Sequence, residues 1–213
     1  MIRNFISTIC FAFMAMGAQS QTIDSLFTTI PDAVLPLLDH NSRLDMIDLY
    51  NCKMDAGVGN DLSGHSVLLE KDSTHVLVKT SDISRFEMRL LRHGNDTIYA
   101  CVRTVEMPKE YSQLQFLRTD WYKAGVAHPA DMTFERCWHP SDTLSEDRIE
   151  SLRLALLPAT FKMHWESLSD GTPRLICEVS VISLMKEDQK DALRCLRPLT
   201  YLWREGKLIP ENN

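Results

Sequence analysis

The sequence lacks the short motifs by which most enzymes of known type are identified. It contains no G-x-S-x-G nucleophile elbow, no papain-type C-G-[SA]-C-[WY] segment and no G-x-G-x-x-G or Walker phosphate loop. C-x-x-C and H-x-x-H pairs, with which many zinc sites begin, are also absent. The residues therefore assign no catalytic activity, and they favour a role other than that of an enzyme.

Positive charge is scarce and scattered along the chain. The sequence has 23 Lys and Arg residues against 29 Asp and Glu residues, a formal net charge of −6, and the basic residues form no cluster. Nucleic acid and anionic membrane surfaces are therefore poor partners. After the first twenty residues no apolar run approaches the length of a membrane span, so we expect no transmembrane segment in the mature chain.

The first twenty residues have the pattern of a cleaved signal peptide. A single cation, Arg3, precedes an apolar run at residues 5–15 that is too short to cross a bilayer. Ala18 and Ser20 then occupy the −3 and −1 positions of a cleavage site for which small residues are required. The sequence predicts a mature chain that begins at Gln21 and resides in the periplasm or outside the cell.

Cleavage would remove Cys10 and leave an odd number of cysteines. An oxidising compartment permits disulfides, but at least one thiol must stay free or pair between molecules. A chain of this length buries a sizeable core without a disulfide framework, so we expect at most one or two bridges. The five remaining cysteines are Cys52, Cys101, Cys137, Cys177 and Cys195.

A helix is expected over residues 41–54, with Asn41 or Ser42 as its cap and Asp45 in its first turn. One face of this helix carries apolar residues at helical spacing: Leu44, Ile47 and Tyr50. Upstream, two prolines predict a short, broken helix at residues 30–40. Residues 57–64, GVGNDLSG, should form a loop.

From Ser66 onward the hydrophobic period changes from helical to alternating. Residues 66–80 indicate a hairpin, and two later stretches, residues 86–105 and 161–182, resemble each other closely. Each begins with a Phe on an alternating strand, passes through a turn and returns as an apolar strand. The offset stays nearly constant, at 75 from Phe86 to Phe161 and 76 from Cys101 to Cys177. This is an internal repeat signal, although two generic hairpins can resemble each other by chance.

The segments after each hairpin extend the repeat less regularly. Phe116 aligns with Tyr201 at an offset of 85, and a helix at residues 186–196 accounts for the excess. Its apolar side is expected at Ala192, Leu193 and Leu196. A further helix at residues 145–158 should place Ile149, Leu152 and Leu156 inward.

These elements predict an α+β fold of two similar halves, each a helix plus an antiparallel β-meander, packed as one unit. The halves span about residues 31–130 and 142–210, within one domain over residues 21–213. A lone hairpin does not bury its apolar face stably, so the halves should pack against each other.

The run LPLLDHNSRLDMIDLYNCKM at residues 35–54, together with TDW at residues 119–121, resembles a known family. The family consists of exported Bacteroidales proteins of the domain-of-unknown-function type (DUF3256-like). The resemblance covers nearly the whole mature chain and implies export from a Gram-negative cell. It implies no activity and no site residues.

The best candidates for a metal site are Cys137, His139 and His128. Cys137 and His139 form a C-x-H pair that would point two ligands the same way on an extended segment. No second ligand pair accompanies them, so a surface loop with a half-buried Trp138 and Cys137 is the preferred interpretation. We therefore expect no metal and no cofactor.

Two carboxylates, Asp45 and Asp48, are the best candidates for acid and base roles because they lie at i and i+3 on one helix face. Helix-capping charge is the simpler interpretation. His164 alternates with the apolar residues of its strand and should be solvated. A hydrolase of unfamiliar type would use Asp45, Asp48 or His139 in a cleft between the halves.

The preferred functional interpretation is an exported periplasmic or surface-associated binding or scaffolding module. Its ligand is unknown, and its partner would be a protein or glycan of the cell envelope. Two loops, residues 57–64 and residues 124–131, could present a recognition surface. The hydrolase is the alternative.

Overall fold

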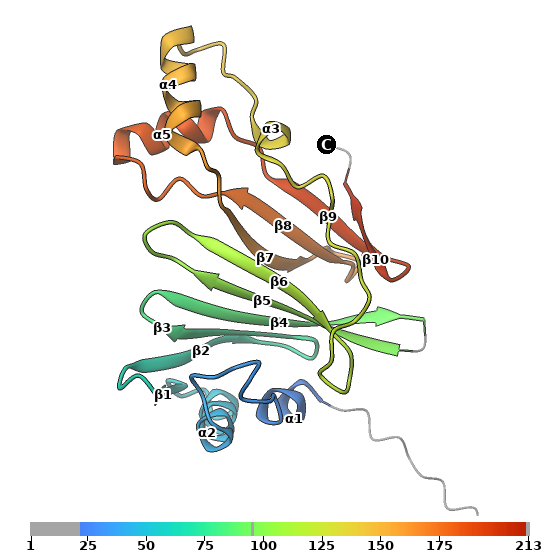
Figure 1. Ribbon diagram of the computed structural model, residues 1–213. Helices are drawn as coiled ribbons and strands as arrows, with labels where there is room; N and C mark the ends of the chain where they lie inside the picture. Colours follow the sequence, from blue (N-terminus) through green and yellow to red (C-terminus); the bar gives the residue numbers. More distant parts are fainter. Residues whose placement is uncertain (1–21, 95, 212–213) are drawn as a thin grey trace, which may run out of the picture.

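The computed structural model describes residues 22–94 and 96–211 (Figure 1). The predicted signal peptide at residues 1–20 and the predicted first mature residue, Gln21, lie outside the described residues. Within the described part of the chain, no helix has the length and apolar character needed to cross a membrane.

The predicted α+β class is confirmed, because the chain forms two antiparallel sheets and five helices in the residues described. The first sheet has six strands in chain order: β1 (Gly57–Gly59), β2 (His65–Lys71), β3 (His75–Ser81), β4 (Ser84–His93), β5 (Asp96–Val105) and β6 (Tyr111–Leu117). The second has four strands in the order β10, β9, β8, β7: β7 (Phe161–Ser167), β8 (Pro173–Val179), β9 (Leu199–Arg204) and β10 (Lys207–Pro210). The helices are α1 (Ile23–Thr28), α2 (His40–Asn51), α3 (Phe134–Cys137), α4 (Glu146–Leu156) and α5 (Lys186–Arg194).

The six-stranded sheet has an apolar core on each of its two faces. Helices α1 and α2 cover its outer face, where Phe86 and Met88 of β4 are buried (Figure 1). Its inner face shares a second core with the four-stranded sheet and with α3, α4 and α5, and Leu91 of β4 belongs to that core. Alternation along β4 thus sends neighbouring side chains into two different cores.

Side chains of the first sheet accept hydrogen bonds from the backbone along the unpaired edge of β7. In the described chain, β7 pairs with β8 alone, so the backbone N–H groups along its other edge need acceptors. The N–H of Met163 donates to Ser112 Oγ over 2.9 Å, and the N–H of Trp165 donates to Glu87 Oε1 over 3.0 Å. Met163 and Trp165 point into the core, while Lys162, His164 and Glu166 form a polar face on the other side of β7.

Helix α2 differs from its prediction in both its cap and its buried face. It begins at His40, and Asp39 is the cap, because Asp39 Oδ1 accepts the Ser42 N–H over 2.7 Å. The apolar stripe predicted through Leu44 was wrong, since Leu44 is 40% exposed. The buried face is formed by Met46 and Ile47 together with Arg43, whose guanidinium donates to the backbone carbonyls of Thr28 and Leu38. Arg43 is therefore buried on the inner face of α2, where backbone carbonyls accept its hydrogen bonds.

Three further local predictions were wrong. The segment predicted as a broken helix at residues 30–40 instead forms turns up to residue 39, where the Pro31 carbonyl accepts the N–H groups of Val34 and Leu35. Gly57–Gly59 is an edge strand, because it pairs with β2, and not part of a loop. In α5, Leu193 is 57% exposed while Ala192 is buried.

The remaining predicted elements are confirmed. The hairpins β2–β3, β4–β5 and β7–β8 and the helices α4 and α5 all form at the predicted segments. Leu152 and Leu156 of α4 are buried as expected, and Ile149 is half-buried.

Strand register supports the similarity of the two hairpins and corrects its continuation. Met88 lies opposite Cys101 in the first hairpin, and Met163 lies opposite Cys177 in the second. On the next strands Leu117 faces Tyr99 and Tyr201 faces Leu175, so Tyr201 is equivalent to Leu117 and not to Phe116. The packing also differs: Phe86 is 1% exposed, whereas Phe161 is only half-buried. Duplication as the origin of the halves stays a prediction.

Candidate functional site

The structure does not bring the predicted catalytic residues together. Asp45 and Asp48 are exposed on α2, in the layer that covers the outer face of the six-stranded sheet. Asp45 lies beyond the first turn of that helix, so the predicted capping role was wrong. His139 is exposed and lies two residues after the end of α3, a helix that Figure 1 shows on the other side of that sheet.

The three predicted metal ligands do not form a site, because one is buried and two are exposed. Cys137 is fully buried within α3, so the expected extended C-x-H segment was wrong, and burial raises the pKa of its thiol to about 11. His139 and His128 are exposed, and the His128 ring lies 5.8 Å from the Phe116 ring. No group of three or more His, Cys, Asp or Glu side chains in residues 22–94 and 96–211 could hold a metal ion.

A cleft of about 410 Å³ lies at the junction of the two sheets, where the polar face of β7 meets the inner face of β2 to β5. Its walls contain His75 and Glu87, both buried, with His75 Nε2 2.7 Å from Glu87 Oε1. On the β7 side, Glu166 accepts from Arg174 over 2.8 Å, and this guanidinium holds the pKa of Glu166 below its usual value. His164, predicted to be solvated, is half-buried and lies 3.5 Å from Glu166.

The polar groups of this cleft mainly join the two sheets. Glu87 Oε1 contacts both His75 and the backbone N–H of Trp165. Thr104 is the one hydroxyl residue among the described lining residues, and its Oγ1 lies 2.7 Å from Ser112 Oγ. Since Ser112 also receives the Met163 N–H, these hydroxyls are engaged in holding β7.

A larger hollow, of about 640 Å³, lies at the end of the molecule where four segments from both sheets meet. The segments are His93 with residues 96–98, residues 118–120 after β6, residues 124–127, and Gly206 with Lys207 in and after the β9–β10 turn. Residues 124–127 belong to one of the two predicted recognition loops. We call this hollow the end hollow.

The segment that follows β6 is fixed in place by the sheet. The Ala124 N–H donates to the Phe116 carbonyl over 2.8 Å, and the ring of Trp121 packs 4.8 Å from that of Tyr99. Arg118 and Asp120 form a 2.5 Å ion pair at the rim, and the hydrogen bond from Arg118 lowers the pKa of Asp120. The hollow therefore presents an ordered rim with both signs of charge.

The imidazole of His93 packs against the backbone of Gly206. A Cβ at position 206 would lie 1.7 Å from His93 Nδ1, so any other residue there would force the ring to move. Glu205 and Gly206, with φ of 51° and 77°, form a two-residue hairpin turn that requires left-handed backbone. The end of β4 thus lies beside the turn between β9 and β10, where Trp203 Nε1 also donates to the Arg92 carbonyl over 2.7 Å.

A family model described as "Protein of unknown function (DUF3256)" matches residues 15–208. The chain belongs to the DUF3256 family. The predicted resemblance to this family is thereby confirmed. A solved structure, described as a domain of an uncharacterized protein from Porphyromonas gingivalis W83, is 21% identical with a TM-score of 0.65, and the match covers 89% of this chain and 98% of that chain. The likeness shows a shared fold. No curated protein matches the chain.

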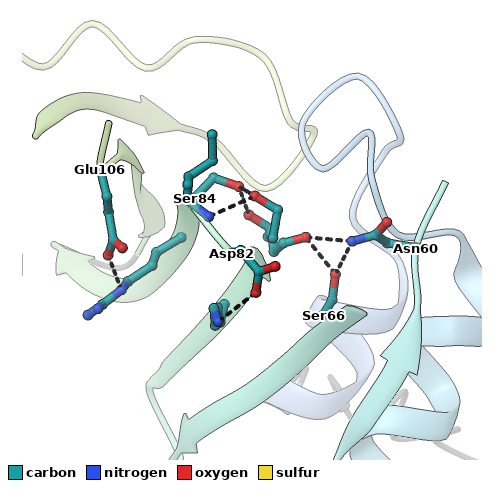
Figure 2. A network of polar contacts seen from close by, with 10 residues as sticks. Asn60, Ser66, Asp82, Ser84 and Glu106 are labelled. Carbon is teal, nitrogen blue, oxygen red and sulfur yellow. Dashed lines mark hydrogen bonds and ion pairs between the residues drawn. The ribbon is translucent and has the colours of Figure 1, made fainter. Parts of the chain in front are cut away.

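The other predicted recognition loop of this DUF3256 chain is organised by one side chain, Asn60 (Figure 2). Its Nδ2 donates to Ser66 Oγ over 3.2 Å and to the Thr80 carbonyl over 3.0 Å. Its Oδ1 accepts the N–H groups of Leu62 and Gly64. The loop at residues 60–64, which follows β1, is thus tied to β2 and β3, and it does not line the end hollow.

Of the residues that line the end hollow, only those of the loop at residues 124–127 were predicted from the sequence. The dipeptide Glu205–Gly206 between two apolar runs is a hairpin signal that could have located the turn. Nothing in the local pattern indicates that His93 would reach Gly206, because the two residues are distant in sequence and meet only through sheet packing.

Proposed function

We propose that this protein is an exported binding or scaffolding module of the cell envelope, located in the periplasm or at the cell surface, that holds a protein or glycan partner. The observation that carries the proposal is the end hollow. Loops from both sheets meet there and enclose a concave space of about 640 Å³.

The lining of the end hollow has the chemistry of a recognition site. Ile98 and Val126 supply apolar surface, and Asp96, Lys207 and the Arg118–Asp120 pair supply charges at the rim. Binding pockets commonly combine apolar walls with a few polar groups that set orientation. Loops that are held by a rigid scaffold are the usual carriers of such groups.

The test uses a substitution that fills the end hollow without straining the backbone. Gly125 has an ordinary φ, and no atom lies within 4 Å of a Cβ added there. Gly125→Trp should therefore fold normally and obstruct the end hollow. Gly59→Trp is the matched control, because Gly59 has the same freedom but lies on β1 in the other predicted loop.

Each purified protein is immobilised and exposed to an envelope extract of the producing cell, and bound proteins and glycans are identified by mass spectrometry. We expect a component that the wild type and Gly59→Trp retain and Gly125→Trp loses. Equal retention by Gly125→Trp would reject the end hollow as the site, and loss in Gly59→Trp alone would assign recognition to residues 57–64.

Export is proposed from Arg3, Ala18 and Ser20 and is tested separately. Amino-terminal sequencing of the protein recovered from the envelope fraction should begin at Gln21. An intact Met1 on the exported protein would contradict cleavage.

A hydrolase is the second candidate function, favoured by the buried His75–Glu87 pair that borders the junction cleft. A histidine held by a carboxylate can serve as a general base. Chromogenic esters and glycosides would be assayed with the wild type, His75→Gln and the exposed control Glu178→Gln. Turnover that only His75→Gln abolishes would favour the enzyme, provided that His75→Gln keeps the native circular dichroism.

A further inference from the structure

The β9–β10 turn, which borders the end hollow, also borders a smaller pocket of about 320 Å³. This pocket is rich in arginine. Arg89 and Arg92 of β4 and Arg204 of β9 all line it, and Leu90, Pro173 and Trp203 contribute apolar walls. Glu205 is the one carboxylate residue among its described lining residues, and it is exposed on the turn. In a chain with a formal charge of −6, three guanidinium groups around one pocket are a local exception.

Arg89 is buried without a carboxylate partner. It is 5% exposed and forms no ion pair among the described residues; its Nη2 donates to Ser167 Oγ, and its Nε has no hydrogen-bond partner. Burial lowers the pKa of its guanidinium, and the charges of Asp72 and Glu87 partly oppose this effect. A buried charge is costly unless it is paired, so this donor calls for an acceptor that the described residues do not supply.

The two carboxylates whose charges act on Arg89, Asp72 and Glu87, are hydrogen-bonded to other groups. Asp72 Oδ1 accepts the backbone N–H of Thr74 over 2.6 Å and its hydroxyl over 3.0 Å. Glu87 Oε1 contacts His75 and the Trp165 N–H. Neither carboxylate lies within ion-pair distance of Arg89, although both act on it through their charge.

Arg92 and Arg204 are exposed, and neither forms an ion pair with a carboxylate of the described chain. Arg204 acts on Asp170 only through a longer-range charge interaction. The pocket therefore combines a buried guanidinium that has one unpartnered N–H, on Arg89, with two exposed guanidinium groups that form no ion pair.

We propose that this arginine pocket binds a compact oxyanion, namely the phosphate, sulfate or carboxylate group of a small soluble ligand. Arg89 provides the buried anchor, and Arg92 and Arg204 donate from the rim. The planar guanidinium fork matches two oxygens of such a group at once, which favours arginine over lysine for this recognition. The proposal rests on these residues alone and does not depend on the function of the end hollow.

The test is isothermal titration of the purified protein at low ionic strength with inorganic phosphate, sulfate, glucuronate and, as a neutral control, glucose. We expect one site per chain for at least one oxyanion, binding that weakens as salt is added, and no binding of glucose. Preference for phosphate and sulfate would assign a tetrahedral group, and preference for glucuronate would assign a sugar acid; either supports the proposal.

The deciding variant is Arg92→Gln/Arg204→Gln, which removes two exposed charges and leaves the buried Arg89 in place. Its affinity should fall by about tenfold or more, since charge-assisted hydrogen bonds are the strong ones. The control Arg153→Gln/Lys190→Gln removes the same charge from α4 and α5 and should bind as the wild type does. Absence of oxyanion binding in the wild type, or an equal loss in the control, would overturn the proposal.

Discussion

The carboxylate of Glu87 on β4 accepts a hydrogen bond from the backbone N–H of Trp165 on β7, with 3.0 Å between the two atoms. The same oxygen, Oε1, lies 2.7 Å from Nε2 of His75 on β3. Because β4 and β7 belong to different sheets, this one side chain joins the edge of the second sheet to the face of the first. A charged residue on an inward strand position thus acts as a structural connector.

Replacing Glu87 should destabilise the protein strongly. Glu87→Ala leaves the buried His75 and the Trp165 N–H without their acceptor, so we expect a loss of about 3–5 kcal/mol in unfolding free energy. Glu87→Gln keeps an acceptor oxygen and should cost less. Urea unfolding gives both values, and Glu178→Ala, an exposed change in the same cleft, should stay within about 0.5 kcal/mol. Equal costs for Glu87→Ala and Glu178→Ala would contradict the connecting role.

The two equivalent phenylalanines should differ in their contribution to stability. Phe86 is fully buried between β4 and the α1–α2 layer, so Phe86→Ala should cost about 3–5 kcal/mol. Phe161 is half-buried at the start of β7, so Phe161→Ala should cost clearly less. Lys162→Ala removes a partly exposed ion pair with Glu110 and serves as the low-cost control. Equal urea midpoints for the two Phe variants would show that the halves pack equivalently after all.

The hairpins could be predicted from sequence because their signal is local. Alternating residues around a turn predicted two strands at residues 86–105, and both strands form, with Met88 opposite Cys101. The inward face of α2 could not be predicted, because Arg43 is buried by carbonyls of Thr28 and Leu38 that only the folded chain supplies.

The functional surfaces were harder to predict for the same reason. The loop at residues 124–127 was identified by its composition, but the hollow it borders also needs His93 and Gly206 from distant strands. Glu87 and Arg89 alternate with apolar residues and are expected to face water by pattern alone. The second sheet covers them instead, and no local pattern encodes that contact.

Asn60 should be important for the stability of the loop at residues 60–64. Asn60→Ala removes four hydrogen bonds, two to the loop backbone and two to β2 and β3, and we expect a loss of about 1–3 kcal/mol. The matched control is Asn51→Ala, because Asn51 makes a single 3.4 Å contact with Asp24 on the surface. Urea unfolding of both variants tests the difference, and amide hydrogen exchange should show Leu62 and Gly64 deprotected only in Asn60→Ala.

Stability should fall in alkaline solution because of the buried thiols. Burial raises the pKa of Cys101 from 9.0 to about 12, and that of Cys177 likewise to about 12. Between these values the unfolded chain loses protons that the folded chain keeps, so the stabilisation is complete below about pH 9 and is lost as the pH rises toward 12. Urea midpoints measured across this range should decline, and less steeply in Cys101→Ala. Parallel curves for the two proteins would contradict a contribution from Cys101.

The contact between His93 and Gly206 can be separated from backbone strain by comparing two glycines. Gly206 and Gly171 both have positive φ, 77° and 82°, but a Cβ would collide with the His93 ring only at position 206. Gly171→Ala should therefore cost about 1 kcal/mol from backbone strain alone, and Gly206→Ala should cost more because the ring must move. In a His93→Ala background the cost of Gly206→Ala should fall to that of Gly171→Ala, which urea unfolding of the double-mutant cycle would measure. A cost that His93→Ala leaves unchanged would mean that the ring does not rest on the turn, and that the end of β4 is held by other contacts.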